Sequence, residues 1–388
     1  MSEYQYYEFV AVDRPLDSAQ QAQVRALSTR ARITATSFTN DYQWGNFRGD
    51  PRRLVELYYD AHLYVTNWGT HQVMLRLPKK LLDLRTVQPY LLDEHTEAWT
   101  TGTHLIVDLR SDDEGGDWDE TAEDALAVIV GVRAELTGGD LRALYLAWLS
   151  ALAAWEREDD DEEEFRSVLE PPVPAGLAEL TAPQRALADF LRVDPDLLAV
   201  AAEASAAAAA QPPPSTKREL APLVAALPEK DKNAFLLRLA LGQDPHLSTD
   251  LLHRLLGAPA PATLPGRRSA ALLLDAAHKR RENRKQHALR QAAQEAARRE
   301  RAEAAVREQR LASLAEQGEA AWQRVESLID AKRAAEYDMA VALLQDLHEI
   351  STRAGLSQEF GSRLHLLREQ HYRKPAFIRR LDHGNLPR

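Results

Sequence analysis

The chain divides into two parts of different composition. Residues 1–170 contain 19 of the 26 aromatic residues and carry 32 acidic against 16 basic side chains. Residues 171–388 are rich in Ala, Leu and Arg and carry 32 basic against 27 acidic side chains. Aromatic and β-branched residues favour strands, whereas Ala, Leu and Arg favour helices. The sequence therefore predicts an α+β N-terminal domain, with a small mixed or antiparallel sheet and helices. An all-α C-terminal region with a long helix is expected to follow.

Composition excludes several classes of protein. A length of 388 residues predicts two or three domains. No run of 18 apolar residues occurs, and the N-terminus lacks a basic and apolar leader, so we expect a cytoplasmic protein with no membrane partner. The absence of cysteine excludes disulfides, Cys-ligated zinc and thiol nucleophiles. The net charge of −11 disfavours nucleic-acid binding by the whole surface and leaves room for a local basic patch. The Ala, Leu and Arg usage fits a bacterial, GC-rich genome.

The first domain is predicted over residues 1–157. Strands are expected over residues 4–13, 33–42, 62–66, 72–77 and 104–109. Asp17 or Ser18 should cap one helix, and Asp50-Pro51 should open the next. Two apolar helices over residues 122–136 and 140–155 should pair on one face of the sheet. This order suggests a sheet of ferredoxin-like style.

Proline and charge runs divide the rest of the chain. The predicted divisions are an acidic and Pro-rich linker over 158–176, a short-helix region over 177–257 with a Pro-rich break at 211–216, a linker over 258–266, a long basic helix over 267–333 and a C-terminal helical hairpin with a basic tail over 334–388. Thr181 should cap a helix, and Gly355 should end the first arm of the hairpin. The apolar seam of the long helix is mostly Ala upstream, so it is not a coiled coil throughout.

The long helix offers a nucleic-acid-binding candidate. Residues 267–311 hold 13 basic and six acidic side chains. The candidate phosphate contacts are Lys279, Arg281, Arg284, Lys285 and Arg298, together with Arg379 and Arg380 in the basic tail. Two alternatives are a solvated helix with i,i+4 pairs such as Glu303–Arg307, and a contact with the acidic run 158–164. The solvated helix is favoured, because the stripe lacks aromatic residues for base stacking.

The aromatic residues of the first domain offer a protein-binding candidate. A small sheet cannot bury all of them, and several stand beside arginines. The predicted patch consists of Trp44, Arg48, Arg52, Arg53 and Trp68. Core packing is the alternative for these rings.

Signatures of catalysis or metal binding are weak. The chain has no Gly-x-Ser-x-Gly, no phosphate-binding Gly-rich loop and no His-x-x-x-His. Residues 111–120 hold six carboxylates but fail the EF-hand pattern, so a solvated loop is favoured. His62 and His71 lie at the two ends of a predicted hairpin, where strand pairing would bring them together. His62, His104 and Asp108 form the strongest enzyme candidate, and no cofactor or metal is predicted.

Two segments resemble known proteins. Residues 3–16, EYQYYEFVAVDRPL, with Leu27-Ser28-Thr29-Arg30-Ala31 and Tyr42-x-Trp44-Gly45, resemble a group of uncharacterised bacterial proteins of about this length. That resemblance covers the first domain well and the remainder loosely. The segment from Trp322 to Leu347 is similar to one in some bacterial SWIM-type zinc-finger proteins, which implies a shared pathway. Because the chain lacks cysteine, it is not itself such a finger, and neither resemblance implies an activity or a role for any residue.

The leading functional hypothesis is a non-enzymatic protein-interaction or adaptor protein, with an aromatic head and a helical docking arm. Another protein is the expected partner. The alternative is a nucleic-acid-associated protein that binds through the basic helix. A second alternative is an enzyme with its site in the α+β head. The sequence leaves the oligomeric state open.

Overall fold

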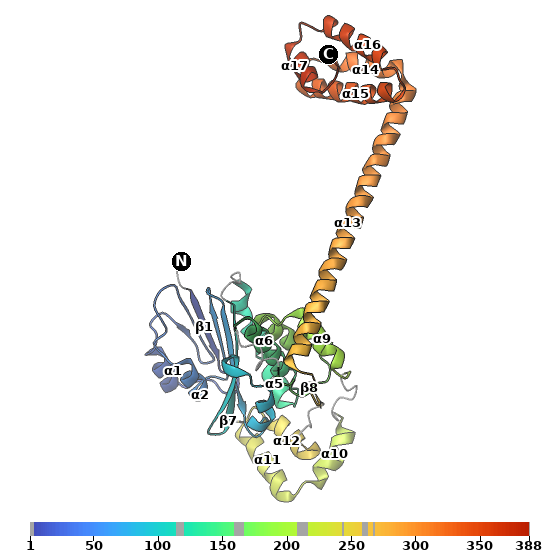
Figure 1. Ribbon diagram of the computed structural model, residues 1–388. Coiled ribbons are helices and arrows are strands. Elements are labelled where there is room, and N and C mark those ends of the chain that lie inside the picture. The colour runs from blue at the N-terminus through green and yellow to red at the C-terminus, as the bar shows by residue number, and fades with distance from the viewer. Residues whose placement is uncertain are drawn as a thin grey trace. The chain divides into compact units, whose positions relative to one another are not determined.

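The computed structural model describes residues 4–113, 120–158, 167–207, 216–242, 244–257, 263–266 and 268–387 (Figure 1). The chain forms two compact units, Met1–Asn283 and Arg284–Arg388. Helix α13 (Ala270–Gln317) contributes residues to both. Most of the acidic loop predicted over 111–120, the acidic run 159–164 and much of the Pro-rich segments lie outside the described residues.

The first unit is built on an antiparallel sheet, which in the described residues has seven strands in the order β2-β3-β1-β4-β5-β7-β6. The strands are β1 (Gln5–Val10), β2 (Arg32–Ile33), β3 (Ser37–Tyr42), β4 (Ala61–Thr66), β5 (Thr70–Pro78), β6 (Thr96–Thr101) and β7 (His104–Asp112). This confirms the predicted α+β class. The ferredoxin-like expectation is replaced, because hairpins rather than crossing helices join β4 to β5 and β6 to β7.

Both faces of the sheet are covered, and alternation along the strands explains why. Leu75 and Val107 point to one face, whereas their neighbours Met74 and Ile106 point to the other, and all four are buried. On the second face lie α1 (Ser18–Arg25) and α2 (Pro51–Leu57), as Figure 1 shows. Asp17 caps α1 in a capping box and Asp50 caps α2, with Pro51 at its first position, as the sequence predicts.

Helices cover the opposite face. They include the 3-10 helix η3 (Glu120–Asp124) and the α-helices α4 (Leu126–Ile129), α5 (Val132–Thr137) and α6 (Arg142–Glu158). Three shorter helices in the first unit are α3 (Leu84–Val87) and the 3-10 helices η1 (Gln88–Tyr90) and η2 (Asp93–His95). The helix expected over 122–136 is interrupted at Gly131. A Cβ atom at this position would lie 2.8 Å from Pro183 Cγ, so glycine permits the close approach of α8 (Ala182–Phe190).

The first unit extends beyond the predicted boundary at residue 157. Helices α8 (Ala182–Phe190) and α9 (Pro195–Ala204) and the start of α13 bury Leu187, Leu197 and Leu273 in the same core as the sheet. A two-residue strand β8 (Val173–Pro174) pairs with β9 (Thr263–Leu264). The observed unit extends past residue 157 because the apolar stripes of these helices require burial, and they are buried against the helical layer over the sheet.

Helices α10 (Lys217–Ala226), α11 (Glu229–Leu241) and α12 (Leu247–Leu256) also belong to the first unit. The structure describes every residue of these three helices, and none of them is buried. Gly242, with φ +62°, ends α11. This helical segment is therefore attached mainly by surface contacts.

The basic helix predicted over 267–333 is two helices. Helix α13 ends at Gln317, and Gly318 (φ +47°, ψ −111°) separates it from α14 (Glu319–Asp330). The helices α14, α15 (Ala334–Arg353), α16 (Ser357–Gln370) and α17 (Pro375–His383) share one core in the second unit. The hairpin predicted over 334–388 is thus part of a larger bundle, because Val325 and Ile329 of α14 are buried against it. Gly355, with φ +75°, follows the end of α15 as predicted.

Candidate binding pocket

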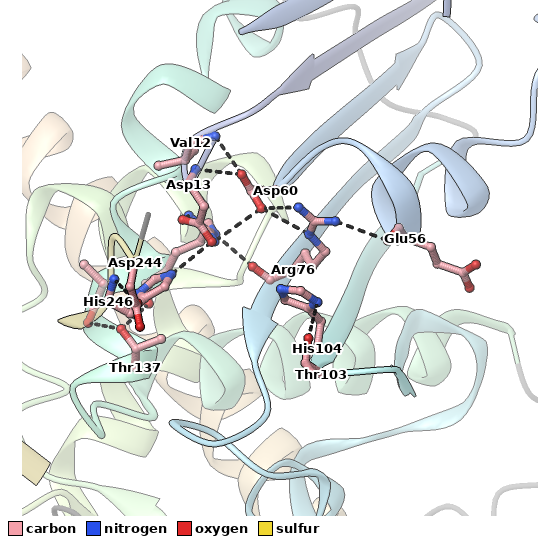
Figure 2. A network of polar contacts seen from close by, with 12 residues as sticks. Val12, Asp13, Glu56, Asp60, Arg76, Thr103, His104, Thr137, Asp244 and His246 are labelled. Atoms are coloured by element: carbon pink, nitrogen blue, oxygen red, sulfur yellow. Dashed lines mark hydrogen bonds and ion pairs between the residues drawn. The ribbon is translucent and has the colours of Figure 1, made fainter. Parts of the chain in front are cut away.

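A pocket of about 650 Å³ opens on the first unit. Its walls come from the chain after β1, the end of α2, the end of β5, the start of β7 and the connection between α11 and α12 (Figure 2). A volume of this size is typical of sites for small organic ligands.

The buried carboxylate of Asp60 organises the floor of the pocket. Its Oδ2 accepts hydrogen bonds from the backbone N–H groups of Val12 and Asp13, both at 2.8 Å. Its Oδ1 accepts from Arg76, at 3.1 Å from Nε and 2.7 Å from Nη2. Asp60 therefore fixes the chain after β1 against the strand that carries Arg76.

Arg133 of α5 lies beside this carboxylate and is only 4% exposed. Its Nη1 and Nη2 donate to the two carboxylate oxygens of Asp13 at 3.0 and 2.9 Å. Its Nε donates to the carbonyl oxygen of Arg76 at 3.0 Å, and its Nη2 lies 3.7 Å from Asp60 Oδ1. The planar guanidinium thus joins α5 to β5 and to the chain after β1.

His246, in the connection between α11 and α12, completes the network. Its Nε2 lies 3.0 Å from Asp13 Oδ2. Burial alone would raise the pKa of Asp13, but the hydrogen bonds from His246 and Arg133 outweigh burial and hold this pKa well below its usual range. The Asp13 carboxylate is therefore charged and fully engaged, which makes it a poor general base.

Ion pairs hold the α11–α12 connection over the pocket. Lys80, after β5, lies 3.0 Å from Asp250 and 3.7 Å from Asp244. Arg238 of α11 pairs with both of these carboxylates. Polar contacts, rather than buried apolar ones, thus attach this part of the helical segment.

The remaining pocket groups are mainly cationic. The lining holds three carboxylates and four Lys or Arg side chains. Lys79 and Arg14 are exposed, and neither makes an ion pair within the described residues. Burial and the nearby Arg76 guanidinium lower the pKa of His104, which lines the same wall. The pocket therefore has unneutralised hydrogen-bond donors facing solvent.

Hydroxyl groups in the wall do not form a catalytic arrangement. The Tyr58 hydroxyl donates to the Gln23 side chain at 2.5 Å, and the Thr103 hydroxyl lies 3.3 Å from His104 Nδ1. Within the described ranges, no group of three or more His, Asp or Glu side chains is arranged to hold a metal ion. The arrangement is suited to holding a ligand through charge and shape.

The predicted protein-binding residues lie in separate places. Trp44 is 66% exposed, lies 5.5 Å from the Arg30 guanidinium, and lines a second pocket of about 350 Å³ with Arg48. Trp68 lies in the β4–β5 turn and is 40% exposed.

Arg52 and Arg53 lie at the start of α2 and contact carboxylates. Arg52 pairs with Glu97 and stacks 4.8 Å from the Trp99 ring centroid, and it lies 3.4 Å from Asp108. Arg53 pairs with Glu56 at 3.0 Å. The structure thus brings Trp44 and Arg48 together and puts Arg52 in a different cluster.

The predicted nucleic-acid contacts are also divided. Lys279 and Arg281 lie in the first unit, where Arg281 pairs with Asp194 at the N-terminus of α9. Arg284, Lys285 and Arg298 lie on the part of α13 that belongs to the second unit. In α17, Arg379 is exposed, whereas Arg380 pairs with Asp338 of α15.

The three residues of the enzyme candidate, His62, His104 and Asp108, do not meet in one site. His62 and Asp108 occupy one row across the sheet, but Met74 of the intervening strand separates them. Of the three, only His104 lines the pocket described above. Asp108 accepts two hydrogen bonds from Gln72, at 2.7 and 2.9 Å, and burial raises its pKa.

The expected meeting of His62 and His71 is also wrong. The register pairs His62 with Met74 and His71 with Val65. His71 instead donates to the Phe190 carbonyl oxygen at 2.7 Å, on the face covered by α8. Val65, the partner of His71, lies three positions after His62 in β4. Because side chains alternate between the two faces along a strand, His62 and His71 point to opposite faces of the sheet.

His62 has a structural role that predicts a pH dependence. It is fully buried, stacks 4.0 Å from the Phe9 ring centroid and donates from Nδ1 to the Glu8 carbonyl oxygen at 2.9 Å. Burial lowers its pKa from 6.5 to about 4. The His62 imidazole therefore binds a proton near pH 6.5 in the unfolded chain but only near pH 4 in the folded chain.

We expect the free energy of unfolding of the first unit to fall as the pH drops from 6.5 to 4, by up to ~3 kcal/mol from this residue. Urea unfolding across this range should show a smaller pH slope for His62→Leu. The exposed His365→Asn variant should keep the slope of the unsubstituted chain. An unchanged slope in His62→Leu would contradict the assignment.

Sequence reasoning missed Arg76, which lines the pocket, and the buried Asp60 and Arg133 beneath it. One signal was present, because Arg133 is a charged residue inside the apolar helical run over 122–136. A charged side chain in such a position is buried only with a partner. Its partner Asp13 lies 120 residues away, which no local pattern reveals.

Comparisons with protein-family models, with curated proteins and with solved structures give no match. In the described part of the chain, no helix combines the length and the apolar character needed to cross a membrane.

Proposed function

We propose that this chain is a cytoplasmic, non-enzymatic adaptor. Its first unit binds one protein partner, and its helical second unit docks with another protein. The observation that carries this proposal is the orientation of α11, which turns its apolar side to solvent.

In α11 a charged side chain faces the protein and apolar side chains face solvent, the reverse of the usual distribution in a surface helix. Arg238 faces inward, where it pairs with Asp244 and Asp250. Leu236, Leu237, Leu239 and Leu241 are exposed by 60–64%. Leu237 and Leu241 lie at i and i+4 and are therefore neighbours on one face of the helix, to which we refer as the α11 ridge.

Burying such a ridge is favourable. Each fully buried leucine contributes about 1.5–3 kcal/mol relative to exposure. Contiguous exposed apolar surface on a protein typically marks an interaction site. An apolar groove on a partner, flanked by polar groups, would match the ridge.

The second unit supports the docking role. A groove of about 490 Å³ lies between the end of α13, α14 and α15. Leu328 and Leu343 provide apolar walls, Arg324 contributes a positive charge, and the adjoining Met339 is 51% exposed. Flexible Met side chains suit surfaces that adapt to a partner.

The pocket supports binding rather than turnover. Its carboxylates are held in ion pairs, Asp13 with Arg133, Glu56 with Arg53 and Asp244 with Arg238, so they are poorly suited to act as a general base.

Affinity capture from cells that naturally produce the chain tests the proposal. We expect Leu237→Glu/Leu241→Glu to lower recovery of a specific protein partner about tenfold or more. Val128→Glu/Leu272→Glu, the same change at exposed positions elsewhere in the first unit, should not lower it. Equal recovery with both double variants would contradict the proposal.

A specific observation also favours the alternative of nucleic-acid binding. Arg290, Arg298 and Arg299 are exposed on α13 and make no ion pair within the described ranges. If these arginines bind phosphates, partners in the capture experiment should vanish after nuclease treatment. Affinity for DNA or RNA should then fall steeply with salt, because binding releases counterions.

A further inference from the structure

We propose that the pocket of the first unit binds a small organic anion. Its oxyanion head, a phosphate or a carboxylate, would contact Lys79, Arg14 and His104. Its apolar body would lie along Leu57, Tyr58 and Pro245. This inference goes beyond the adaptor proposal, because the pocket and the α11 ridge are different surfaces.

The first argument is the state of the carboxylates in and beneath the pocket. Asp60 already accepts four hydrogen bonds, and Asp13 is bound by both Arg133 and His246. Asp244 is paired with Lys80 and Arg238. Glu56, the third carboxylate of the lining, pairs with Arg53 at 3.0 Å and accepts from Trp99 Nε1 at 3.1 Å. These acids are therefore compensated locally, which reduces their repulsion of an incoming anion.

The second argument is the position of the remaining cations. Arg14 follows Asp13, whose backbone N–H is held by Asp60. Lys79 follows the last residue of β5, and its backbone N–H donates to the Thr103 carbonyl oxygen at 3.0 Å. Rigid backbone thus positions both cations at the pocket, which reduces the entropy cost of gathering them round a ligand.

His104 adds a third donor on the same wall. It pairs in register with Pro78, the residue before Lys79. Its neighbours Arg76 and Arg133 disfavour its protonation, whereas Asp60 and Asp13 favour it. An anion bound beside the ring adds a further favourable charge and raises the pKa of His104.

The size and walls of the pocket define the rest of the ligand. About 650 Å³ exceeds what a free phosphate ion requires and suits a ligand of small-molecule size. Leu57, Tyr58, Pro78 and Pro245 supply apolar surface for a ring or a short chain.

The acidic character of the surrounding sequence does not oppose this site. Residues 1–170 carry twice as many acidic as basic side chains. At physiological salt, however, the Debye length is about 8 Å, so exposed charges beyond the pocket are largely screened. The nearest charges, which the ligand touches, decide the sign of the local field.

Titration calorimetry on the 388-residue chain tests the inference with three probes. Phenyl phosphate and benzoate supply the two oxyanions on a similar ring, and benzyl alcohol is the neutral control. We expect at least one of the two anions to bind and benzyl alcohol not to bind. Preference for phenyl phosphate identifies a phosphate ligand, and preference for benzoate identifies a carboxylate.

Variants assign the binding to this pocket. We expect Lys79→Gln and Arg14→Gln each to weaken binding of the anion about tenfold, as loss of one charge-assisted hydrogen bond does. Lys217→Gln, at an exposed position on α10, should leave affinity unchanged. NMR of the histidine rings should show a higher pKa for His104 with the anion present.

Two results would overturn the inference. One is the absence of binding by both anions at millimolar concentration. The other is binding that neither Lys79→Gln nor Arg14→Gln weakens. Both substitutions remove exposed side chains, so circular dichroism and thermal unfolding should match those of the unsubstituted chain.

Discussion

Replacing Arg133 by methionine is expected to destabilise the first unit by about 3–5 kcal/mol. Methionine fills a similar volume but removes three hydrogen bonds, two to Asp13 and one to the Arg76 carbonyl oxygen. The carboxylate of Asp13 then stays in place with only His246 as its partner. Urea unfolding followed by tryptophan fluorescence measures the loss.

Arg53→Met is the matched control for this substitution. Arg53 is 62% exposed and pairs with Glu56 on the surface, so its loss should cost less than about 1 kcal/mol. Asp13→Asn combined with Arg133→Met should cost less than the sum of the single changes, because the two side chains interact directly. A cost for Arg133→Met no larger than that of Arg53→Met would contradict the network.

The second large effect is expected from Gly266→Ala, which should destabilise the first unit by about 3 kcal/mol or more. A Cβ atom at residue 266 would overlap the Glu170 carbonyl oxygen and lie 2.6 Å from the Pro171 oxygen. Backbone atoms cannot move aside as the end of a side chain can. Calorimetric unfolding should show the transition of the first unit at a lower temperature.

The overlap at Gly266 would also disturb the start of α13. Arg268 donates to both carboxylate oxygens of Glu170, at 2.9 and 2.6 Å, and to the Val200 carbonyl oxygen at 2.9 Å.

Gly361→Ala is the control of opposite sign. It lies inside α16 with open space round its Cβ position, so alanine should stabilise the second unit by about 0.5–1 kcal/mol. Equal, small effects of both changes would contradict the close approach at Gly266.

Local signals in the sequence predicted most of the individual elements. Asp17, Asp50 and Thr181 cap helices because their side-chain oxygens satisfy free N–H groups at the helix start, a requirement that neighbouring residues alone define. Gly355 follows the end of α15 for an equally local reason. Strand β6 was missed, since its residues Thr96–Thr101 carry few of the apolar side chains that mark a buried strand.

Features that depend on distant residues could not be predicted. The polar network beneath the pocket joins Asp13, Asp60 and Arg133, and no short motif spans these separations. Composition predicts a domain boundary at 157, whereas the extent of the observed unit depends on which surface the apolar stripes of α8 and α9 cover. The predicted aromatic–arginine residues do not form one patch, because Trp68 lies in a hairpin turn and Arg52 pairs with Glu97.

Photo-crosslinking from the α11 ridge tests the adaptor proposal most directly. A photoreactive benzoylphenylalanine is placed at Leu237, or at the exposed Val128 of α4 as a control, in cells that naturally produce the chain. The account predicts a discrete protein adduct from residue 237 that persists after nuclease treatment and is absent from residue 128. No protein adduct at 237, or the same adducts at both positions, would contradict it.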